Sequence, residues 1–293
     1  MLVTTHSRMR GMHGFIGDKM LRNLLKLVIA VVAIYGLLYP FIQPVEQSEE
    51  VVEATKEEKK PVKKVEVEKP LHNVKLPDFA NIQDVREKKQ AFFDFIKPHV
   101  IKENQTILQQ RASLEIALMM LQFEEELTST QVKKLDDIFA YYRLDEGEYT
   151  VERIKNALIH VDIIPKELAL MQAANESAWG TSRFARIGLN FFGQWCYKKG
   201  CGLVPKRRAN EAAHEVAAFK SVRASVQSYF RNLNTHNAYA ELRAKRAQLR
   251  AEKKPIEATE LTEGLLSYSE RGDAYIEELN DMIRHNKAYF NEE

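Results

Sequence analysis

Glu176 has the most unusual surroundings for its residue type. It lies near the end of a segment of helical length, residues 166–180, whose members are almost all small or apolar. Burial in such a helix disfavours the ionised carboxylate and raises its pKa, and the negative end of the helix dipole acts in the same direction. A carboxylic acid that holds its proton near neutral pH is suited to general acid catalysis, and glycoside hydrolysis needs such an acid. Glu176 is therefore the first candidate for a catalytic residue.

A second interpretation of Glu176 stays open at this point. A glutamate on a solvated helix face would carry an ordinary charge and could pair with Arg183 or Arg186. Neighbours such as Ala174 and Trp179 favour burial, but they do not by themselves exclude the solvated position. The two interpretations differ in the partner of the carboxyl group, which the three-dimensional structure has to decide.

The composition argues against several other kinds of site. The 293-residue chain carries 43 basic and 41 acidic residues, a net charge of +2, without the concentrated basic excess typical of nucleic-acid binders. It contains no glycine-rich nucleotide-binding motif, no zinc-protease helix motif and no serine-hydrolase elbow. The eight histidines are scattered without metal-ligand spacing. We therefore predict no nucleic-acid partner, no cofactor and no bound metal.

Cys196 and Cys201 are the only cysteines, and a glycine, Gly200, lies between them. A pair at this spacing can close a small disulfide in an oxidising compartment. Two cysteines without a nearby histidine make a poor zinc site, because zinc needs four ligands. The spacing favours a disulfide over two free thiols.

An apolar run near the N-terminus, residues 24–42, predicts a membrane anchor. It is slightly short of the roughly 20 residues that cross a bilayer as a helix, but the side chain of Lys26 can extend outward. Basic residues precede the run and acidic residues follow it, so the positive-inside rule places residues 1–23 in the cytoplasm and the rest of the chain outside. A cleaved signal peptide is the alternative interpretation.

Three regions follow the apolar run. Residues 43–75 are rich in glutamate, lysine and valine, a composition that cannot bury enough apolar area to offset chain entropy, so we predict a flexible charged linker. Residues 76–150 repeat the apolar spacing of amphipathic helices and predict a helical subdomain. Residues 151–293 contain Glu176 and the two cysteines and predict a second domain, also mainly helical.

Caps and prolines predict where the first helices begin and end. Asp84 should cap a helix that ends before Pro98, and a further helix should cover residues 103–126. Thr128 and Thr150 should each cap one more helix. These helices are expected to build the core and carry no chemistry of their own.

The helix that contains Glu176 should begin near Pro165 and end near Gly180. Because it is small or apolar nearly all round, it should lie in the middle of its domain. An irregular segment, residues 187–204, and a short strand within residues 214–219 are expected next, before helices resume around residue 222.

Two motifs resemble those of the glucosaminidases of glycoside hydrolase family 73, and the most similar members are the bacterial Bax-type proteins. The motifs are Gln172-Ala-Ala-Asn-Glu-Ser-Ala-Trp-Gly-Thr-Ser182 and Asn190-Phe-Phe-Gly193. The resemblance covers roughly residues 80–290. Glu-Ser alone would be less specific, because lytic transglycosylases and goose-type lysozymes also carry it.

The resemblance implies a mainly α fold, a lysozyme-like α+β catalytic domain with a small β-lobe. It implies that residues 151–293 are a glucosaminidase domain that hydrolyses the β-1,4 bonds of peptidoglycan glycan strands, with Glu176 as general acid. Together with the apolar run and its flanking charges, the resemblance to bacterial cell-wall enzymes predicts a single-pass inner-membrane protein with its catalytic domain in the periplasm, or a periplasmic protein if the N-terminal segment is cleaved.

The resemblance is less clear for the other site residues. A second carboxylate is expected on the β-lobe, where Glu211 and Glu215 are candidates, although each could be an ordinary solvated loop charge. Tyr268 matches a family tyrosine that is expected to face the scissile bond, and an ordinary core position is the alternative.

Four further residues are interpreted as substrate-binding: Trp195, Asn190, Phe192 and Tyr229. Sugar rings stack their apolar C–H faces on aromatic planes, and Asn190 could hydrogen-bond a sugar or hold its own loop. Two other functions stay open: a lytic transglycosylase, which needs only one catalytic acid, and a catalytically silent glycan-binding envelope protein.

Overall fold

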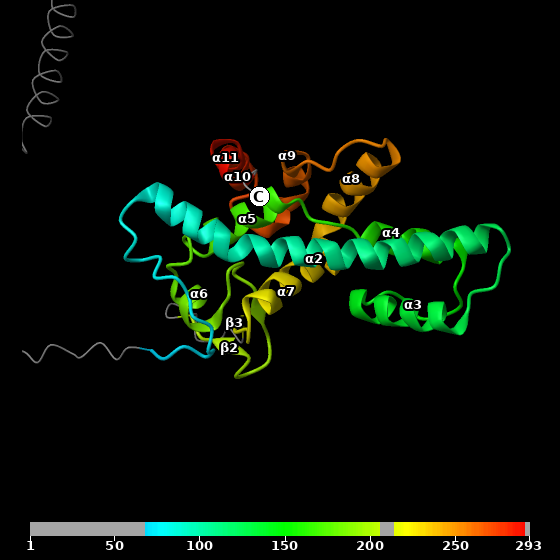
Figure 1. The fold of residues 1–293 in the computed structure, drawn as a ribbon, viewed down its shortest axis with the longest axis horizontal. Coiled ribbons are helices and arrows are strands. Elements are labelled where there is room, and N and C mark those ends of the chain that lie inside the picture. The colour runs from blue at the N-terminus through cyan, green and yellow to red at the C-terminus, as the bar shows by residue number, and fades with distance from the viewer. Residues whose placement is uncertain (1–67, 206–213, 291–293) are drawn as a thin grey trace, which may run out of the picture. The chain divides into compact units, whose positions relative to one another are not determined.

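The computed structural model describes residues 68–205 and 214–290 of the chain (Figure 1). Residues 65–293 form one compact unit. The predicted anchor, residues 24–42, lies outside the described residues, as does most of the predicted linker. Within the described ranges, none of the helices combines the length and apolar character that crossing a membrane requires.

The longest element, α2 (Val85–Gln122), is one continuous helix of 38 residues. Asp84 caps it as predicted, because its carboxylate accepts hydrogen bonds from the first N–H groups of the helix. The predicted break at Pro98 is wrong: the proline lies inside the helix. A proline there removes one backbone hydrogen bond and costs about 3 kcal/mol. The buried side chains of Ile96 and Val100 on either side of Pro98 join the same core, so tertiary packing offsets that cost.

Shorter helices pack around α2, and α5 lies among them (Figure 1). Thr128 and Thr150 cap α3 and α4 as predicted. The helices are α3 (Ser129–Tyr142), α4 (Val151–His160), α5 (Lys166–Glu176), α6 (Arg183–Gly188), α7 (Val222–Thr235), α8 (Ala240–Ala251), α9 (Ala258–Leu261), α10 (Asp273–His285) and α11 (Lys287–Phe290), with 3-10 turns η1 (Asn237–Tyr239) and η2 (Thr262–Tyr268).

A small antiparallel sheet stands beside the helices. Its strands are β1 (Trp195–Cys196), β2 (Gly202–Leu203) and β3 (Glu215–Ala217), in the order β1-β3-β2. The short strand predicted within residues 214–219 is confirmed as β3. A mainly helical chain with one small sheet fits the expected lysozyme-like class.

One hydrophobic core joins residues on both sides of position 150. Ile107 and Leu114 of α2 share this core with Ile154 and Ala157 of α4. The side chains of α5 from Leu168 to Ala174 are fully buried, as its apolar composition predicts. The helix that carries Glu176 is therefore held on several sides, while the subdomain boundary at residue 150 stays a prediction.

A buried ion cluster fixes the chain just before α5. The carboxylate of Asp162 accepts two hydrogen bonds from the Arg250 guanidinium, at 3.0 and 2.8 Å, and lies 3.3 Å from a nitrogen of Arg111. Arg246, which is fully buried, donates to four backbone carbonyls, those of Ile159, His160, Asp162 and Ile163. Burial raises the pKa of Asp162, but the three arginines outweigh it and hold that pKa below its ordinary value.

Candidate active site

Glu176 is the last residue of α5, so the helix ends earlier than predicted. The backbone then turns through three successive left-handed residues: Ala178, Trp179 and Gly180, with φ of 49°, 56° and 76°. Ser177 holds this turn, since its hydroxyl donates to the Ala173 carbonyl and accepts from the Gly180 N–H at 2.9 Å. The turn leaves the Glu176 side chain at the open end of a rigid helix.

Packing explains two other residues of the first motif. A Cβ atom at Gly180 would lie 2.4 Å from the ring of Phe79, so only glycine fits there. The indole of Trp179 contacts the edges of the Phe92 and Phe93 rings and has the ammonium group of Lys89 at 5.3 Å from its centre. The motif thus anchors the turn after α5 onto α2.

The Glu176 carboxyl is half-buried, and its surroundings differ from those of an ordinary surface glutamate. Burial raises its pKa, the carboxylate of Glu278 raises it further, and a hydrogen bond from Tyr275 to Oε1 at 3.3 Å lowers it, with a net increase. The pairing with Arg183 or Arg186 is wrong, because Arg183 pairs with Glu68 and Arg186 donates to the Thr181 carbonyl. The structure thus supports the first interpretation of this residue.

A buried chain of hydrogen bonds orients the carboxyl group of Glu176. The Tyr229 hydroxyl donates to Oε1 of Gln172, and the Gln172 amide donates to the Tyr275 hydroxyl at 3.0 Å. Tyr275 in turn donates to Glu176. Each hydroxyl or amide in this chain donates to the next residue toward Glu176. Because the Tyr275 hydroxyl accepts from Gln172, its own proton points to the carboxyl group of Glu176.

Sequence reasoning missed the roles of Gln172 and Tyr275. Gln172 lies four residues before Glu176, a spacing that places both on the same face of a helix and could have suggested contact. Tyr275 had no comparable signal, because it reaches the site from α10, 99 residues away in the chain.

The second motif forms a loop that approaches the Glu176 carboxyl. Asn190 is buried and holds the loop: its amide donates to the carbonyls of Gln194 and Ala217, both at 2.8 Å, and its oxygen accepts from two loop N–H groups. Gly193 has φ of 65°, and a Cβ there would lie 3.4 Å from Oε2 of Glu176. Of its two predicted roles, the structure supports the loop-holding role of Asn190.

Tyr268 lies between this loop and Tyr275. Its hydroxyl donates to the Phe192 carbonyl at 3.0 Å, and its ring is nearly parallel to that of Tyr275, with centres 5.7 Å apart. Burial raises its pKa well above the ordinary tyrosine value. The structure therefore gives Tyr268 a positioning role next to the site, and the predicted contact with a scissile bond stays a prediction.

Two predicted sugar-binding side chains, Phe192 and Tyr229, are buried. Their rings stack on each other with centres 4.0 Å apart, behind the loop. Trp195, by contrast, is 57% exposed and stacks on His214 at 4.1 Å. Of the four predicted sugar-binding residues, Trp195 alone presents a large aromatic surface to solvent, and its contact with a sugar stays a prediction.

The two candidates for a second carboxylate have different outcomes. Glu211 lies outside the described residues. Glu215 is buried in β3, and its two oxygens accept hydrogen bonds from the backbone N–H groups of Gly200 and Gly202, at 2.9 and 2.8 Å. The solvated interpretation of Glu215 is therefore wrong. Both oxygens hold the loop between β1 and β2, and the catalytic role of Glu215 stays a prediction.

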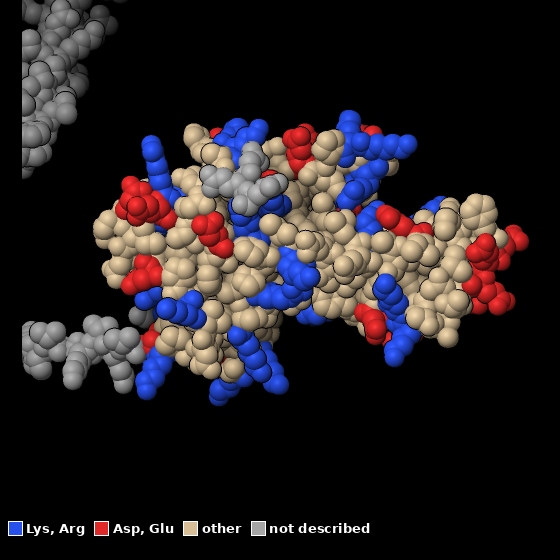
Figure 2. Space-filling view, viewed as in Figure 1, with Lys and Arg blue, Asp and Glu red and all other residues tan. Residues whose placement is uncertain are grey.

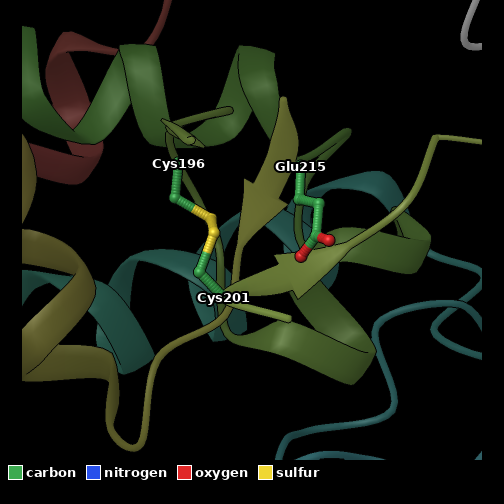
Figure 3. Close-up of side chains that lie close together, drawn as sticks. All are labelled: Cys196, Cys201 and Glu215. Atoms are coloured by element: carbon green, nitrogen blue, oxygen red, sulfur yellow. A yellow bond between two sulfur atoms is a disulfide. The ribbon is translucent and has the colours of Figure 1, made fainter. Parts of the chain in front are cut away.

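Glu215 lies close to the disulfide that joins Cys196 and Cys201 (Figure 3). Their sulfur and oxygen atoms lie within 4.8 Å of one another, a proximity that also occurs in metal sites. Sulfur atoms in a disulfide are not thiolates and do not bind zinc as such. The disulfide and the Glu215 carboxylate are better explained as two interactions that hold the loop between β1 and β2 in place.

An open hollow lies between α10 and the chain around the end of α5, and Asn175, the neighbour of Glu176 in the sequence, is part of its lining. Its lining also includes Trp179, in the turn after α5, and Ala274 and Glu278 of α10. The arrangement offers one half-buried carboxylic acid, Glu176, that keeps its proton to higher pH than an exposed glutamate. That is the requirement for general acid catalysis.

Comparisons with known proteins agree on one family. The profile described as mannosyl-glycoprotein endo-beta-N-acetylglucosaminidase, a glucosaminidase profile, matches residues 151–288. Protein Bax of Escherichia coli (strain K12) is 33% identical over 213 residues, which make up 72% of this chain and 74% of that protein. No solved structure gives a significant match.

Proposed function

Because the chain belongs to the glucosaminidase family of the Bax type, we propose that it is a peptidoglycan N-acetylglucosaminidase. The substrate is the glycan strand of the cell wall, and the reaction is hydrolysis of its β-1,4 glycosidic bonds. Family membership supports a glycan hydrolase, and the identity of the bond is our proposal.

One observation carries the proposal: the Glu176 carboxyl is half-buried, has a raised pKa and is oriented by Tyr275. Glu176 would donate its proton to the leaving oxygen of the scissile bond. The hydrogen bond from Tyr275 would then stabilise the carboxylate that remains. Trp195, exposed on β1, would stack against a sugar ring of the same strand.

A second candidate is a lytic transglycosylase, and Glu215 is the observation that favours it. Both oxygens of this carboxylate are engaged by backbone N–H groups, so Glu215 is badly placed to activate water. A transglycosylase needs one acid only and uses a sugar hydroxyl in place of water. Its products carry a 1,6-anhydro end, whereas those of a hydrolase carry a reducing end.

Digestion of purified peptidoglycan tests both candidates. The fragment of residues 65–293 is suitable because it is one compact unit with its own core. We expect it to release fragments with N-acetylglucosamine at the reducing end, and Glu176→Gln to slow this release about a thousandfold. Glu241→Gln, at an exposed position on α8, is the matched control and should remain active.

Three results would contradict the proposal in different ways. Products with 1,6-anhydro ends would replace the hydrolase with the transglycosylase. Equal release by Glu176→Gln would remove the role given to Glu176. An inactive wild-type fragment that still binds peptidoglycan would favour a silent glycan-binding protein.

We also propose that residues 24–42 anchor the chain in the inner membrane and that the catalytic domain faces the periplasm. The support is the charge asymmetry around this apolar run. Fractionation of cells should recover the full chain with the inner membrane. A periplasmic protein with a shortened N-terminus would show cleavage of a signal peptide instead.

A further inference from the structure

An apolar stripe runs along the solvent side of α2. We call it the α2 stripe and define it as Ile101, Leu108, Ala112, Ile116, Met119 and Phe123, all of which are exposed. Steps of three, four and seven residues keep these positions on one side of a helix. The buried residues of α2, such as Ile107 and Leu114, lie on the opposite side. The helix therefore has a second apolar face that no described residue covers.

Exposed apolar side chains are concentrated on the α2 stripe and are not spread evenly over the surface. Five of the twelve large apolar side chains that are exposed in the described part of the chain lie on it. Together they expose an area on the order of 500 Å², the upper range for a patch on a monomer. A stable interface buries about 800 Å² on each partner, which the stripe and its flanks can approach. In Figure 2 mostly uncharged side chains lie over the C-terminal half of α2, and acidic side chains gather beyond that end.

The pattern of the α2 stripe is nearly symmetric about Ala112. Leu108 and Ile116 lie four residues on either side of it, and Ile101 and Phe123 lie eleven residues on either side. A second copy related by a two-fold axis through Ala112, with its helix antiparallel, would therefore pack Leu108 against Ile116 and Ile101 against Phe123. The small side chain on the axis allows two helices to approach closely. This self-complementarity is what a two-fold interface requires.

Charges at the two ends of the helix favour the same arrangement. Lys97 and Lys102 lie near the N-terminal end of the stripe, and Glu124, Glu125 and Glu126 follow its C-terminal end. Antiparallel helices bring the acidic end of one copy to the basic end of the other, whereas parallel helices would place glutamates beside glutamates. An anionic membrane surface would repel the acidic end. A second copy of this chain is therefore the partner that the charges fit best.

We propose that the α2 stripe is the interface of a homodimer in which two α2 helices pack antiparallel and cross at Ala112. α5 packs on the other side of α2 from the stripe, so the partner copy does not cover Glu176. The dimer therefore carries two separate sites. This inference is independent of the proposed reaction.

Charge substitutions on the axis test the dimer and its geometry together. The mass in solution of the full chain and of residues 65–293 should be that of a dimer. Ala112→Lys and Ala112→Glu each place a charge next to its own copy, so each should raise the dissociation constant about tenfold or more. An equimolar mixture of the two variants should dimerise again, because the axis then joins opposite charges. Lysine and glutamate are good helix formers, and unchanged circular dichroism would show that α2 is intact.

Ala244→Lys is the matched control, since Ala244 is an exposed alanine inside α8. This variant should remain dimeric. A wild-type protein that stays monomeric over the accessible concentrations would overturn the proposal, and so would a dimer that tolerates Ala112→Lys. Failure of the mixture to dimerise would reject the two-fold axis at Ala112. Binding of a monomeric wild type to anionic lipid vesicles, lost in Ala112→Glu, would assign the stripe to a membrane surface.

Discussion

Helix α5 has a buried or half-buried acid at each end, and the two acids have opposite surroundings. Asp162, just before α5, is met by the guanidinium groups of Arg111, Arg246 and Arg250, which lower its pKa against the effect of burial. Glu176, at the other end, is met by a tyrosine hydroxyl and by the field of another carboxylate, and its pKa is raised. The acid before α5 is thus held in its charged form, and the acid at the end of α5 keeps its proton to higher pH.

The comparison teaches how to separate structural from chemical acids in this fold. A buried carboxylate surrounded by cations stays ionised at all ordinary pH values, so it can hold chain segments together but has no proton to give. A buried carboxyl group without a cation has a raised pKa, so it holds its proton to higher pH than an exposed one. Substitutions at the two ends of α5 should therefore affect different properties.

The largest expected effect is on activity at the Glu176 end. Glu176→Gln should reduce the rate of peptidoglycan cleavage about a thousandfold, because the acid is lost while the shape of the side chain is kept. The melting temperature should hardly change, since the amide can still accept the hydrogen bond from Tyr275. The rate is measured by the release of reducing ends, and the melting temperature by thermal unfolding of the same preparation. A large drop in melting temperature would mean that Glu176 is structural and would break the comparison.

The next effect is on stability at the Asp162 end. Asp162→Asn should lower the free energy of unfolding by about 3 kcal/mol, because it leaves buried arginine charge without its counter-ion. Urea unfolding measures this loss, and Asp281→Asn, at an exposed position on α10, is the control. The folded fraction of Asp162→Asn should keep its catalytic rate. A variant of normal stability but low activity would contradict the structural role of Asp162.

A smaller effect is expected from the partner of Glu176. Tyr275→Phe removes the hydrogen bond that favours ionised Glu176, so the pKa of Glu176 should rise and the alkaline limit of the pH–rate profile should move upward. The rate itself should fall about tenfold, because the carboxyl group loses its orientation.

Tyr268→Phe is the matched control for Tyr275→Phe. It removes a hydroxyl that donates to the Phe192 carbonyl and not to Glu176. Its alkaline limit should stay at the wild-type pH. If both variants shift the limit equally, the chain from Tyr229 to Glu176 does not control the acid.

The smallest effect is the pH dependence of stability, which has opposite signs for the two acids. A raised folded pKa stabilises the protein at low pH, so the contribution of Glu176 should decline as pH rises above 4.5, its ordinary pKa, through the higher folded value. A lowered folded pKa stabilises at high pH, so the contribution of Asp162 should be lost as pH falls below 3.8. Unfolding curves of the wild type, Glu176→Gln and Asp162→Asn across this range would reveal the two signs. If the free energy of unfolding depends on pH in the same way in all three proteins, the two acids do not differ in their effect on stability.

Local signals in the sequence were sufficient for much of this site. The small and apolar residues around Glu176 predicted a buried helix, and the caps at Asp84, Thr128 and Thr150 predicted where three helices begin. The spacing of the two cysteines predicted their pairing. Each of these signals depends on neighbours within a few residues, which the sequence displays directly.

Pro98 and Glu215 show where local signals failed. Pro98 has the properties of a helix end, yet the core on both sides of it keeps α2 continuous. Glu215 has the properties of a loop charge, yet strand pairing opposite Cys196 places its carboxylate against the N–H groups of Gly200 and Gly202. In both cases the deciding partner comes from outside the local segment.

The sequence by itself therefore determined that Glu176 lies near the end of a buried helix and that this helix belongs to a mainly helical chain. Only the tertiary structure decided which groups surround that glutamate and influence its pKa. Its donor, Tyr275, arrives from 99 residues away, and the arginine that binds Asp162 at the other end of α5 arrives from 88 residues away. A pKa depends on burial and on charges within a few ångströms, and folding, not sequence distance, sets both.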